Sequence, residues 1–252
     1  MESTYASGLH IRAPAAQLAD FVDHYWRGLD NRESSYDILP DGCVDVVFYV
    51  QGSRAKLWAY GASSRLKREP IAPGDYLGIR FRPGMARFFL DMPAGGITDR
   101  REEIGRDFPL HIADFFGDLR SEQVFARMDR GLAKCLAHRE PRLSAIDMAI
   151  RRIAASYGDV RIDAIATDLG CSRRQLEREF LRTVGLAPKH FAVISRFRHA
   201  AACLESRPHD SLATIAAHTG YADQSHMVRD FRLLAGTVPS RWPGRVAFVQ
   251  DG

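Results

Sequence analysis

The sequence predicts an α+β fold, in which a β-rich, cupin-like or barrel-like domain with some helices precedes an all-α domain of two helix–turn–helix units. Between residues 46 and 82, short apolar runs are bounded by Gly, Pro or Ser without a helix-sized segment between them, which favours an antiparallel β unit. From residue 121 onward, apolar residues recur with helical spacing. Residues 162–188 and 212–239 repeat one pattern. We therefore expect an α+β domain over 1–118, a linker or dimerisation helix over 119–141 and a tandem helix–turn–helix domain over 142–245.

The first 118 residues mix helical and strand signals. Pro14 suits the first turn of a helix, and the apolar residues of 14–27 have helical spacing, so we predict a helix there. A Pro-Asp-Gly turn at 40–42 leads into the first strand. The other elements expected in this half are strands over 46–50, 56–60 and 76–82, a short helix over 85–92 and small helices within 97–118.

The segment 121–139 has one face that is too apolar for a bare linker. Its apolar residues are Val124, Phe125, Met128, Leu132, Cys135 and Leu136. The helix either packs on the N-terminal domain or forms a dimer interface, and the sequence favours neither alternative. A second helix is expected after Pro141, with Leu143, Ile146, Ile150, Ile153 and Tyr157 on one face.

The two helix–turn–helix copies share their framework. The first contains Ile165-Ala166, Gly170, Leu176, Phe180, Gly185 and Pro188, and the second contains Ile215-Ala216, Gly220, Met227, Phe231, Gly236 and Pro239. The offset is 50 residues at the first isoleucines (165 and 215) and 51 at the phenylalanines (180 and 231). The turn of the second copy is therefore one residue longer.

The local signals of the first copy fit a short helix over 162–169 followed by a helix over 173–183. Gly170 suits a left-handed helix end, and Ser172 suits the N-cap of the second helix. A connecting helix over 188–206 would span roughly 28 Å at ~1.5 Å per residue. Successive major grooves on one face of B-DNA lie ~34 Å apart, so a rigid helix of this length could hold two recognition helices in adjacent grooves.

The second helix of each copy presents different residues on its two faces. Leu176, Phe180 and Thr183 face inward in the first copy, and Met227, Phe231 and Leu234 do so in the second. The outward residues include Arg, Gln and Glu, which can pair with guanine, adenine and cytosine in the major groove. Exposed helices often carry Arg and Glu without binding DNA, but the repetition of the whole frame argues against that interpretation.

Charge and composition agree with this organisation. Residues 1–140 carry 19 Lys and Arg against 20 Asp and Glu, whereas residues 141–252 carry 16 against 11, so the basic excess lies in the half with the repeat. No apolar run approaches the ~20 residues of a membrane span, and no signal peptide is evident, so we expect a cytoplasmic protein. The cysteines, Cys43, Cys135, Cys171 and Cys203, form no CxxC pair and no Cys/His cluster with zinc spacing, and we expect free thiols and no cofactor.

Residues 143–242 closely resemble the two-helix–turn–helix DNA-binding domain of AraC/XylS-type bacterial transcription regulators. The residues that carry the resemblance are Ile165-Ala166, Leu169 to Ser172, Leu176 to Phe180, Gly185, Pro188, Arg196-Phe197-Arg198, Ala201, Leu204, Ile215-Ala216, Gly220-Tyr221, Phe231 and Pro239. The stretch Tyr221–Met227 departs from the family, because histidine and methionine stand where a Tyr/Phe pair is usual.

The resemblance implies contacts with double-stranded DNA. The implied base-contacting residues are Arg174, Glu177, Arg178, Gln224, Ser225, His226 and Arg229. We expect phosphate contacts, which fix the register without reading sequence, from Ser172, Arg173, Arg182, Lys189, Arg196, Arg198 and Arg232.

The N-terminal half is similar to a sensor-like domain found in a subset of these regulators. The marks are Leu39-Pro40-Asp41-Gly42-Cys43-Val44-Asp45 and the run from Gly78 to Gly84. Cys43 is either an exposed sensor thiol or, as we favour, a buried structural residue. Arg80 and Arg82 share one strand face and either hold an anionic effector or, as we favour, pair with Asp41 or Asp45 or lie in solvent.

Metal is not expected in the N-terminal domain, because its histidines, His10, His24, His111 and His138, are scattered. The preferred hypothesis is a sequence-specific transcription regulator without catalytic activity, either monomeric or homodimeric. It would be controlled by an unknown small-molecule effector or by dimerisation at the N-terminal domain, and would contact RNA polymerase if it is an activator. The first alternative is a cysteine alkyl-acceptor protein that responds to DNA alkylation and carries the same DNA-binding domain. The second is a nonspecific architectural DNA binder.

Overall fold

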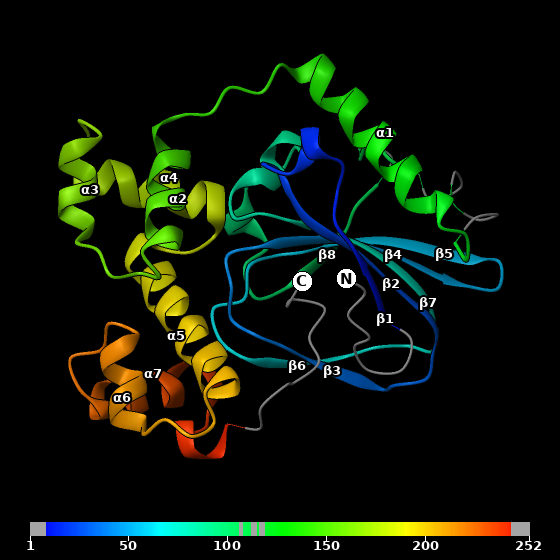
Figure 1. The fold of residues 1–252 in the computed structure, drawn as a ribbon. Helices are drawn as coiled ribbons and strands as arrows, with labels where there is room; N and C mark the ends of the chain where they lie inside the picture. The colour runs from blue at the N-terminus through cyan, green and yellow to red at the C-terminus, as the bar shows by residue number, and fades with distance from the viewer. Residues whose placement is uncertain (1–8, 106–107, 112–114, 116–118, 243–252) are drawn as a thin grey trace.

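The computed structural model describes residues 9–105, 108–111, 115 and 119–242. A β-rich N-terminal half lies beside a helical C-terminal half (Figure 1). The strands form a six-stranded antiparallel sheet in the order β1-β2-β7-β4-β5-β8 and a two-stranded ribbon of β3 and β6. Their bounds are β1 Leu9–Arg12, β2 Val22–Asn31, β3 Ser35–Ile38, β4 Val44–Gln51, β5 Arg54–Tyr60, β6 Lys67–Pro70, β7 Gly74–Phe81 and β8 Arg101–Glu103. The expected antiparallel β unit is confirmed.

Both faces of the large sheet are covered, as the central strand β4 illustrates. Val46 and Phe48 belong to the core shared with α1 (Gln123–Arg139), whereas Val47 and Tyr49 join an aromatic cluster with Ile38 of the ribbon. Successive side chains of a strand point to opposite faces, so one apolar run fills two cores. The sheet is therefore a middle layer between α1 and the ribbon.

The predicted helix over 14–27 is wrong. The structure has a single turn of 3-10 helix, η1 (Ala16–Leu18), followed by the ten-residue strand β2, which pairs with both β1 and β7. A register shift between Val22 and His24 breaks the strand's alternation, so that Val22 and Tyr25 are buried in the same core. This bulge reproduces the i, i+3 spacing that the sequence alone attributes to a helix.

The other N-terminal expectations are met in part. The three expected strands are present as β4, β5 and β7, each with slightly different bounds. The expected helix over 85–92 is shortened to the 3-10 turn η2 (Met85–Phe88). Where small helices were expected over 97–118, the structure has β8, just after the 3-10 turn η3 (Ala94–Gly96), and residues 106–107, 112–114 and 116–118 lie outside the described residues.

Helix α1 packs on the N-terminal half, which is the first of the two alternatives for this segment. It buries Val124, Phe125, Met128, Leu132 and Leu136 in the core of the large sheet. The Tyr25 hydroxyl donates a hydrogen bond of 2.8 Å to the Asp129 carboxylate of this helix. The apolar stripe of α1 is thus accounted for within one chain.

The helical half consists of α2 Ala145–Ala155, α3 Ile162–Asp168, α4 Arg173–Val184, α5 Pro188–Ser206, α6 Leu212–His218 and α7 Gln224–Ala235, followed by the 3-10 turn η5 Pro239–Arg241. Helix α5 lies between the pairs α3–α4 and α6–α7 (Figure 1), and Phe197 at its centre is fully buried. Its bounds match the expected connecting helix. No helix among the described residues is long and apolar enough to cross a membrane.

Candidate nucleic-acid interface

The first helix–turn–helix unit has the expected geometry. Gly170 adopts a left-handed conformation with φ of 64° in the turn after α3. The Ser172 hydroxyl accepts from the Gln175 amide at the start of α4, and the Gln175 side chain accepts from the Ser172 amide at 2.9 Å. This reciprocal capping satisfies amides that would otherwise lack partners at the helix end. It fixes where α4 starts, and hence which residues point outward.

The second unit repeats this geometry with different residues. Asp223 caps α7 by accepting from the His226 amide at 2.6 Å. Four residues separate α3 from α4 and five separate α6 from α7, so the longer second turn is confirmed. The predicted inward residues are buried in both copies: Leu176, Phe180, Thr183, Met227, Phe231 and Leu234.

The outward face of α4 is exposed and mixed in charge. Arg174 is exposed, and Arg178 lies 3.6 Å from Glu179 with 73% of its side chain accessible. Glu177 accepts from Arg173 at 2.9 Å, and Arg182 pairs with Glu179 at 2.8 Å. Exposed pairs of this kind contribute little to stability, so these groups can exchange their partners for an external one.

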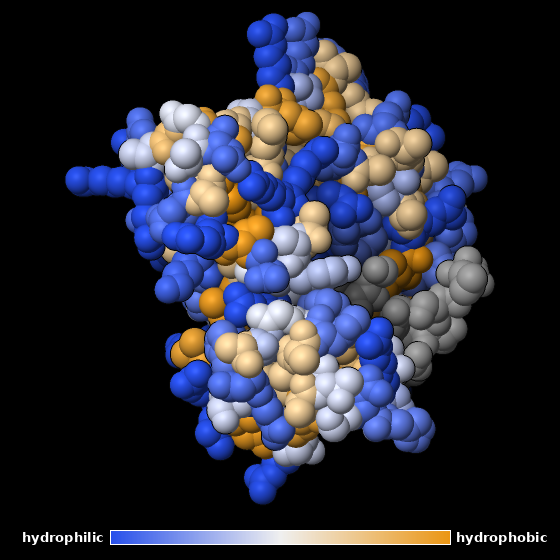
Figure 2. Space-filling model, turned by 60° about the vertical axis from the view of Figure 1, so that its left-hand side comes forward, coloured by the Kyte–Doolittle hydropathy of each residue, from blue (hydrophilic) through white to orange (hydrophobic). Residues whose placement is uncertain are grey.

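The outward face of α7 differs in chemistry. The exposed residues of this face are Gln224, Ser225, Arg229 and, in the last turn of the helix, Arg232. His226 is only half exposed, because its ring packs edge-on against Tyr221 at a centroid distance of 5.1 Å. Figure 2, which brings the helical half forward, shows a face dominated by hydrophilic residues with apolar residues in smaller patches.

The phosphate-contact candidates on α5 fall into two environments. Lys189 is exposed near the first turn of the helix. Arg196 instead points inward: it donates to the Gly158 carbonyl at 3.3 Å and lies over the Tyr221 ring at 5.4 Å. Arg198 is half-buried. In this structure Arg196 links the end of α2 to the second unit, a role that the sequence alone did not indicate.

Two family models match the chain on either side of α1. Residues 165–245 match the model described as a helix-turn-helix domain, and residues 10–103 match a domain of unknown function, DUF6597. Residues 165–245 are a helix-turn-helix domain. No curated protein matches the chain.

Solved structures similar to the chain include AraC-type proteins. The chain is 25% identical to a transcriptional regulator with an AraC-type DNA-binding domain from Chromobacterium violaceum, over 43% of this chain and 95% of that one, with a TM-score of 0.36. It is 26% identical to a probable AraC family regulator from Rhodopseudomonas palustris CGA009, over 39% of this chain and 93% of that one, with a TM-score of 0.35. It is 10% identical to ToxT from Vibrio cholerae, over 94% of this chain and 98% of that one, with a TM-score of 0.44.

The helix-turn-helix domain shares its hydrophobic core with the N-terminal half. Two N-terminal segments reach it, the turn 39–42 and a strap formed by residues 61–66. Leu39 of the turn and Ala62 of the strap belong to the same buried cluster as Phe191 and Val184. A Cβ on Gly42 would lie 2.5 Å from the Phe191 ring, so only glycine allows this approach.

Polar contacts bind the strap to the connecting helix α5 and to the second helix–turn–helix unit. His190 at the start of α5 donates from Nε2 to the Ser64 carbonyl at 2.9 Å. The Leu66 amide donates to the Leu234 carbonyl, in the last turn of α7, at 2.6 Å. The Asp99 carboxylate holds Ser64 from the other side, accepting from its amide at 2.7 Å. The strap therefore touches α5 and α7 at once.

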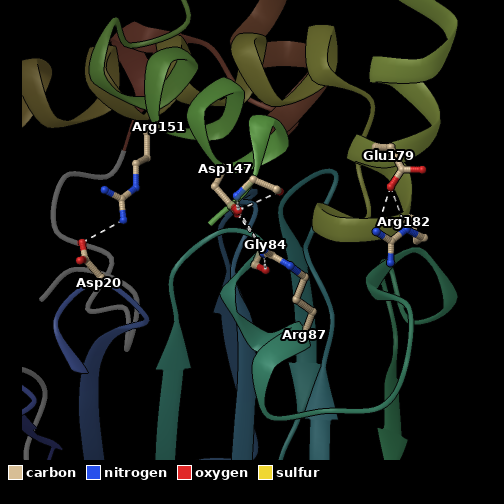
Figure 3. A network of polar contacts seen from close by, with 8 residues as sticks. Asp20, Gly84, Arg87, Asp147, Arg151, Glu179 and Arg182 are labelled. Atoms are coloured by element: carbon tan, nitrogen blue, oxygen red, sulfur yellow. Dashed lines mark hydrogen bonds and ion pairs between the residues drawn. The ribbon is translucent and has the colours of Figure 1, made fainter. Parts of the chain in front are cut away.

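The interface also contains a buried ion pair at α2 (Figure 3). Arg87 of η2 donates to both oxygens of the Asp147 carboxylate at 2.7 Å, and Asp147 also caps α2 by accepting from the Ser144 amide at 2.7 Å. Asp147 is buried. Beside this pair, Arg151 of α2 lies 2.9 Å from Asp20. Several independent contacts therefore fix the two halves relative to each other.

The structure places the candidate sensor residues around a buried ion network. Arg80 is 1% exposed, pairs with Asp45 at 2.6 Å and contacts Asp41. This pairing is the alternative favoured from the sequence. Burial alone would lower the pKa of Arg80, but Asp41 and Asp45 raise it well above its usual value, so the guanidinium stays charged. Arg82 is half exposed and pairs with Asp23 at 3.1 Å.

Cys43 lies next to this network. Burial raises the pKa of its thiol, and the neighbouring carboxylates add to that effect while Arg80 opposes it. A reactive cysteine needs the opposite, a lowered pKa that supplies thiolate. The geometry therefore gives no support to an alkyl-acceptor role for Cys43.

A small cavity of about 30 Å³ lies beside the ion network, between the large sheet and the ribbon. It is lined by Trp26, Tyr36, Ile38, Asp41, Asp45, Val47, Tyr60, Gly61 and Ser63. Among the described residues, the buried Ser63 hydroxyl of this cavity has no hydrogen-bond partner, and the Trp26 indole faces the Asp45 carboxylate. Sequence reasoning missed this cavity, because its residues come from five separate segments.

Proposed function

We propose that the protein is a sequence-specific DNA-binding transcription regulator that reads two successive major grooves with α4 and α7. The observation that carries this proposal is a duplicated frame with two different outward faces. The buried positions of α4 and α7 correspond, and Arg178 corresponds to Arg229. The other outward positions differ: Arg174 corresponds to Ser225, and Glu177 corresponds to Val228. We therefore propose that one chain reads an asymmetric, non-palindromic site.

The length of α5 supports simultaneous reading by both helices. Its 19 residues span roughly 28 Å at ~1.5 Å per residue, and both recognition helices pack against it. The proposed phosphate contacts are Ser172, Arg173, Arg182, Lys189, Arg198 and Arg232, with Arg196 in the supporting role described above. They would position the helices on the duplex without reading sequence.

Selection of bound sites from random duplex DNA tests this proposal. We expect a site of two unlike parts, about 10–10.5 base pairs from centre to centre. Arg174→Ala should relax one part only and weaken binding by ~1–3 kcal/mol at that position, because a bidentate base contact is lost. Arg229→Ala should do the same at the other part. The full chain and a fixed salt concentration are used throughout.

The control is Arg54→Ala, which removes the same charge from an exposed position on β5 of the N-terminal half. It should leave the selected site and the affinity unchanged. If Arg174→Ala weakens binding equally on every sequence, the protein is an architectural binder that does not read bases. A palindromic site of two like halves would instead indicate that one unit of each of two chains does the reading.

We also propose that the cavity beside Arg80 is an effector site that controls the DNA-binding half. The support is that its walls are the interface segments themselves: Asp41 belongs to the turn 39–42, and Gly61 and Ser63 belong to the strap. The Asp41 amide donates to the Ser63 carbonyl at 2.9 Å, which ties the two segments together. The cavity has room for about one water-sized group. A larger effector that forms hydrogen bonds with Asp45, Ser63 and Trp26 would therefore have to move both segments.

Loosening the strap should therefore change how the two units are presented. His190→Ala removes the hydrogen bond to Ser64, and we expect faster amide exchange in peptide 61–66 and a stability loss of about 0.5–1.5 kcal/mol. Affinity for the two-part DNA site should change more than affinity for either part alone. His209→Ala, at an exposed position between α5 and α6, is the control. Unchanged exchange in 61–66 would contradict the role of the strap.

A further inference from the structure

Three side chains of metal-ligating type meet in the helical half. His199 and Cys203 are one turn apart on α5, and His218 is the last residue of α6. One nitrogen from each histidine and the Cys203 sulfur all lie within 4.8 Å of one another. This is the single such group among the described residues.

Neighbouring side chains hold the cluster in place. The Tyr157 ring stacks on the His199 ring at a centroid distance of 3.9 Å and an angle of 19°, which fixes the imidazole's orientation. The buried Nδ1 of His199 has no hydrogen-bond partner among the described residues. A buried ring nitrogen without a hydrogen-bond partner is available as a metal ligand.

We propose that His199, Cys203 and His218 form a binding site for a zinc-class divalent cation. Two imidazole nitrogens and one thiolate suit Zn²⁺, whereas Mg²⁺ and Ca²⁺ prefer oxygen ligands. Ligand atoms about 2.0–2.3 Å from a tetrahedral Zn²⁺ lie closer together than 4.8 Å, so small side-chain rotations complete the site. Cys203 gives up its thiol proton when the metal binds, and water takes the fourth position.

The surroundings admit a cation from one side. His218 is exposed, while Cys203 is 6% exposed, so the site opens to solvent past His218. Arg207 repels a cation, but it lies 4.0 Å from Asp210, which offsets part of its charge. A bound ion would link the connecting helix α5 to the first helix of the second unit. It would therefore restrict the orientation of α6 and α7.

Cobalt(II) added to the full-length protein tests the site through its spectrum. We expect a thiolate-to-cobalt charge-transfer band and the visible bands of tetrahedral Co²⁺, both displaced by Zn²⁺. Zinc should also raise the Tm by about 5–10 °C at a free concentration a hundredfold above Kd. The metal-binding proposal does not depend on DNA binding, and this experiment contains no DNA.

Matched variants separate this cluster from other thiols and histidines. Cys203→Ser should abolish the charge-transfer band, whereas Cys171→Ser should retain it. His218→Gln changes an exposed residue and should weaken metal binding at least tenfold, because even loss of a second-shell partner costs ~10–100-fold. His209→Gln should not weaken it. The proposal is overturned if the wild type lacks the band, or if His218→Gln binds Co²⁺ as tightly as the wild type.

Discussion

Replacing Arg80 with Met is expected to lower the free energy of unfolding by about 3–5 kcal/mol. The guanidinium pairs with Asp45 at 2.6 Å and contacts Asp41, and both carboxylates lie away from solvent beside the domain interface. Met has a comparable length and no charge, so the variant leaves two acidic groups without their counter-ion. Thermal unfolding should show a Tm roughly 6–20 °C lower, at about 2–4 °C per kcal/mol for a chain of this size.

The pH dependence of this loss identifies its cause. Burial raises the pKa of Asp45, and Arg80 opposes that rise. Without Arg80 the folded-state pKa rises further above the unfolded value, so the folded variant binds more protons, and its stability falls as pH increases through that range. The deficit should therefore be larger at about pH 7 than at about pH 5. A deficit independent of pH would indicate a packing defect instead.

Arg82→Met is the matched control, because Arg82 follows the same strand but is half exposed and pairs with Asp23 at 3.1 Å. Exposed pairs contribute ~0–1 kcal/mol, so its Tm should hardly change. Equal losses of stability in the two variants would contradict the prediction that burial makes the Arg80 network costly to break.

Gly158→Ala is expected to destabilise the helical half by roughly 2–5 kcal/mol. Gly158 lies in the turn after α2 with φ of 76°, a left-handed conformation that disfavours a side chain by ~1–2 kcal/mol. A Cβ there would also lie 1.9 Å from the Ala192 carbonyl oxygen of α5, and backbone of a packed helix cannot give way cheaply. Overpacking of this kind adds ~1–3 kcal/mol. Urea unfolding measures the sum.

Gly170→Ala separates the two contributions. Gly170 has a similar φ of 64°, but nothing lies within 4 Å of the position that its Cβ would occupy. This variant should therefore lose only the conformational part, ~1–2 kcal/mol. Equal losses at the two glycines would contradict the close approach of α2 and α5.

The helical half could be predicted closely from the sequence, because its signals are local. The bounds of α4 depend on residues that are close together in the chain: the turn at Gly170, the N-cap Ser172 and the apolar spacing of the helix itself. The N-terminal half depends on pairing between distant strands. There the bulge in β2 placed Val22 and Tyr25 on one face, and local periodicity pointed to a helix. Only the pairing with β1 and β7 decides between the two.

The candidate functional surfaces also differ in how far the sequence predicts them. The outward residues of α4 and α7 follow from a helical wheel, because each helix is regular and capped. The cavity could not be predicted, since Trp26, Asp45 and Ser63 meet only through the sheet and the strap. The metal cluster offered one local signal, the i, i+4 spacing of His199 and Cys203, but His218 joins them only through the packing of α6 on α5.

The shared core has a consequence for how such proteins are recombined. Leu39 and Ala62 fill the same apolar cluster as Phe191, so the border drawn by sequence similarity and the border drawn by hydrophobic packing do not coincide. A chimera that joins these helices to a foreign N-terminal half would leave that cluster open to water. Transplanting the turn 39–42 and the strap 61–66 together with the helices would keep it closed. The N-terminal half thus acts as part of the scaffold, and the two halves are not interchangeable modules.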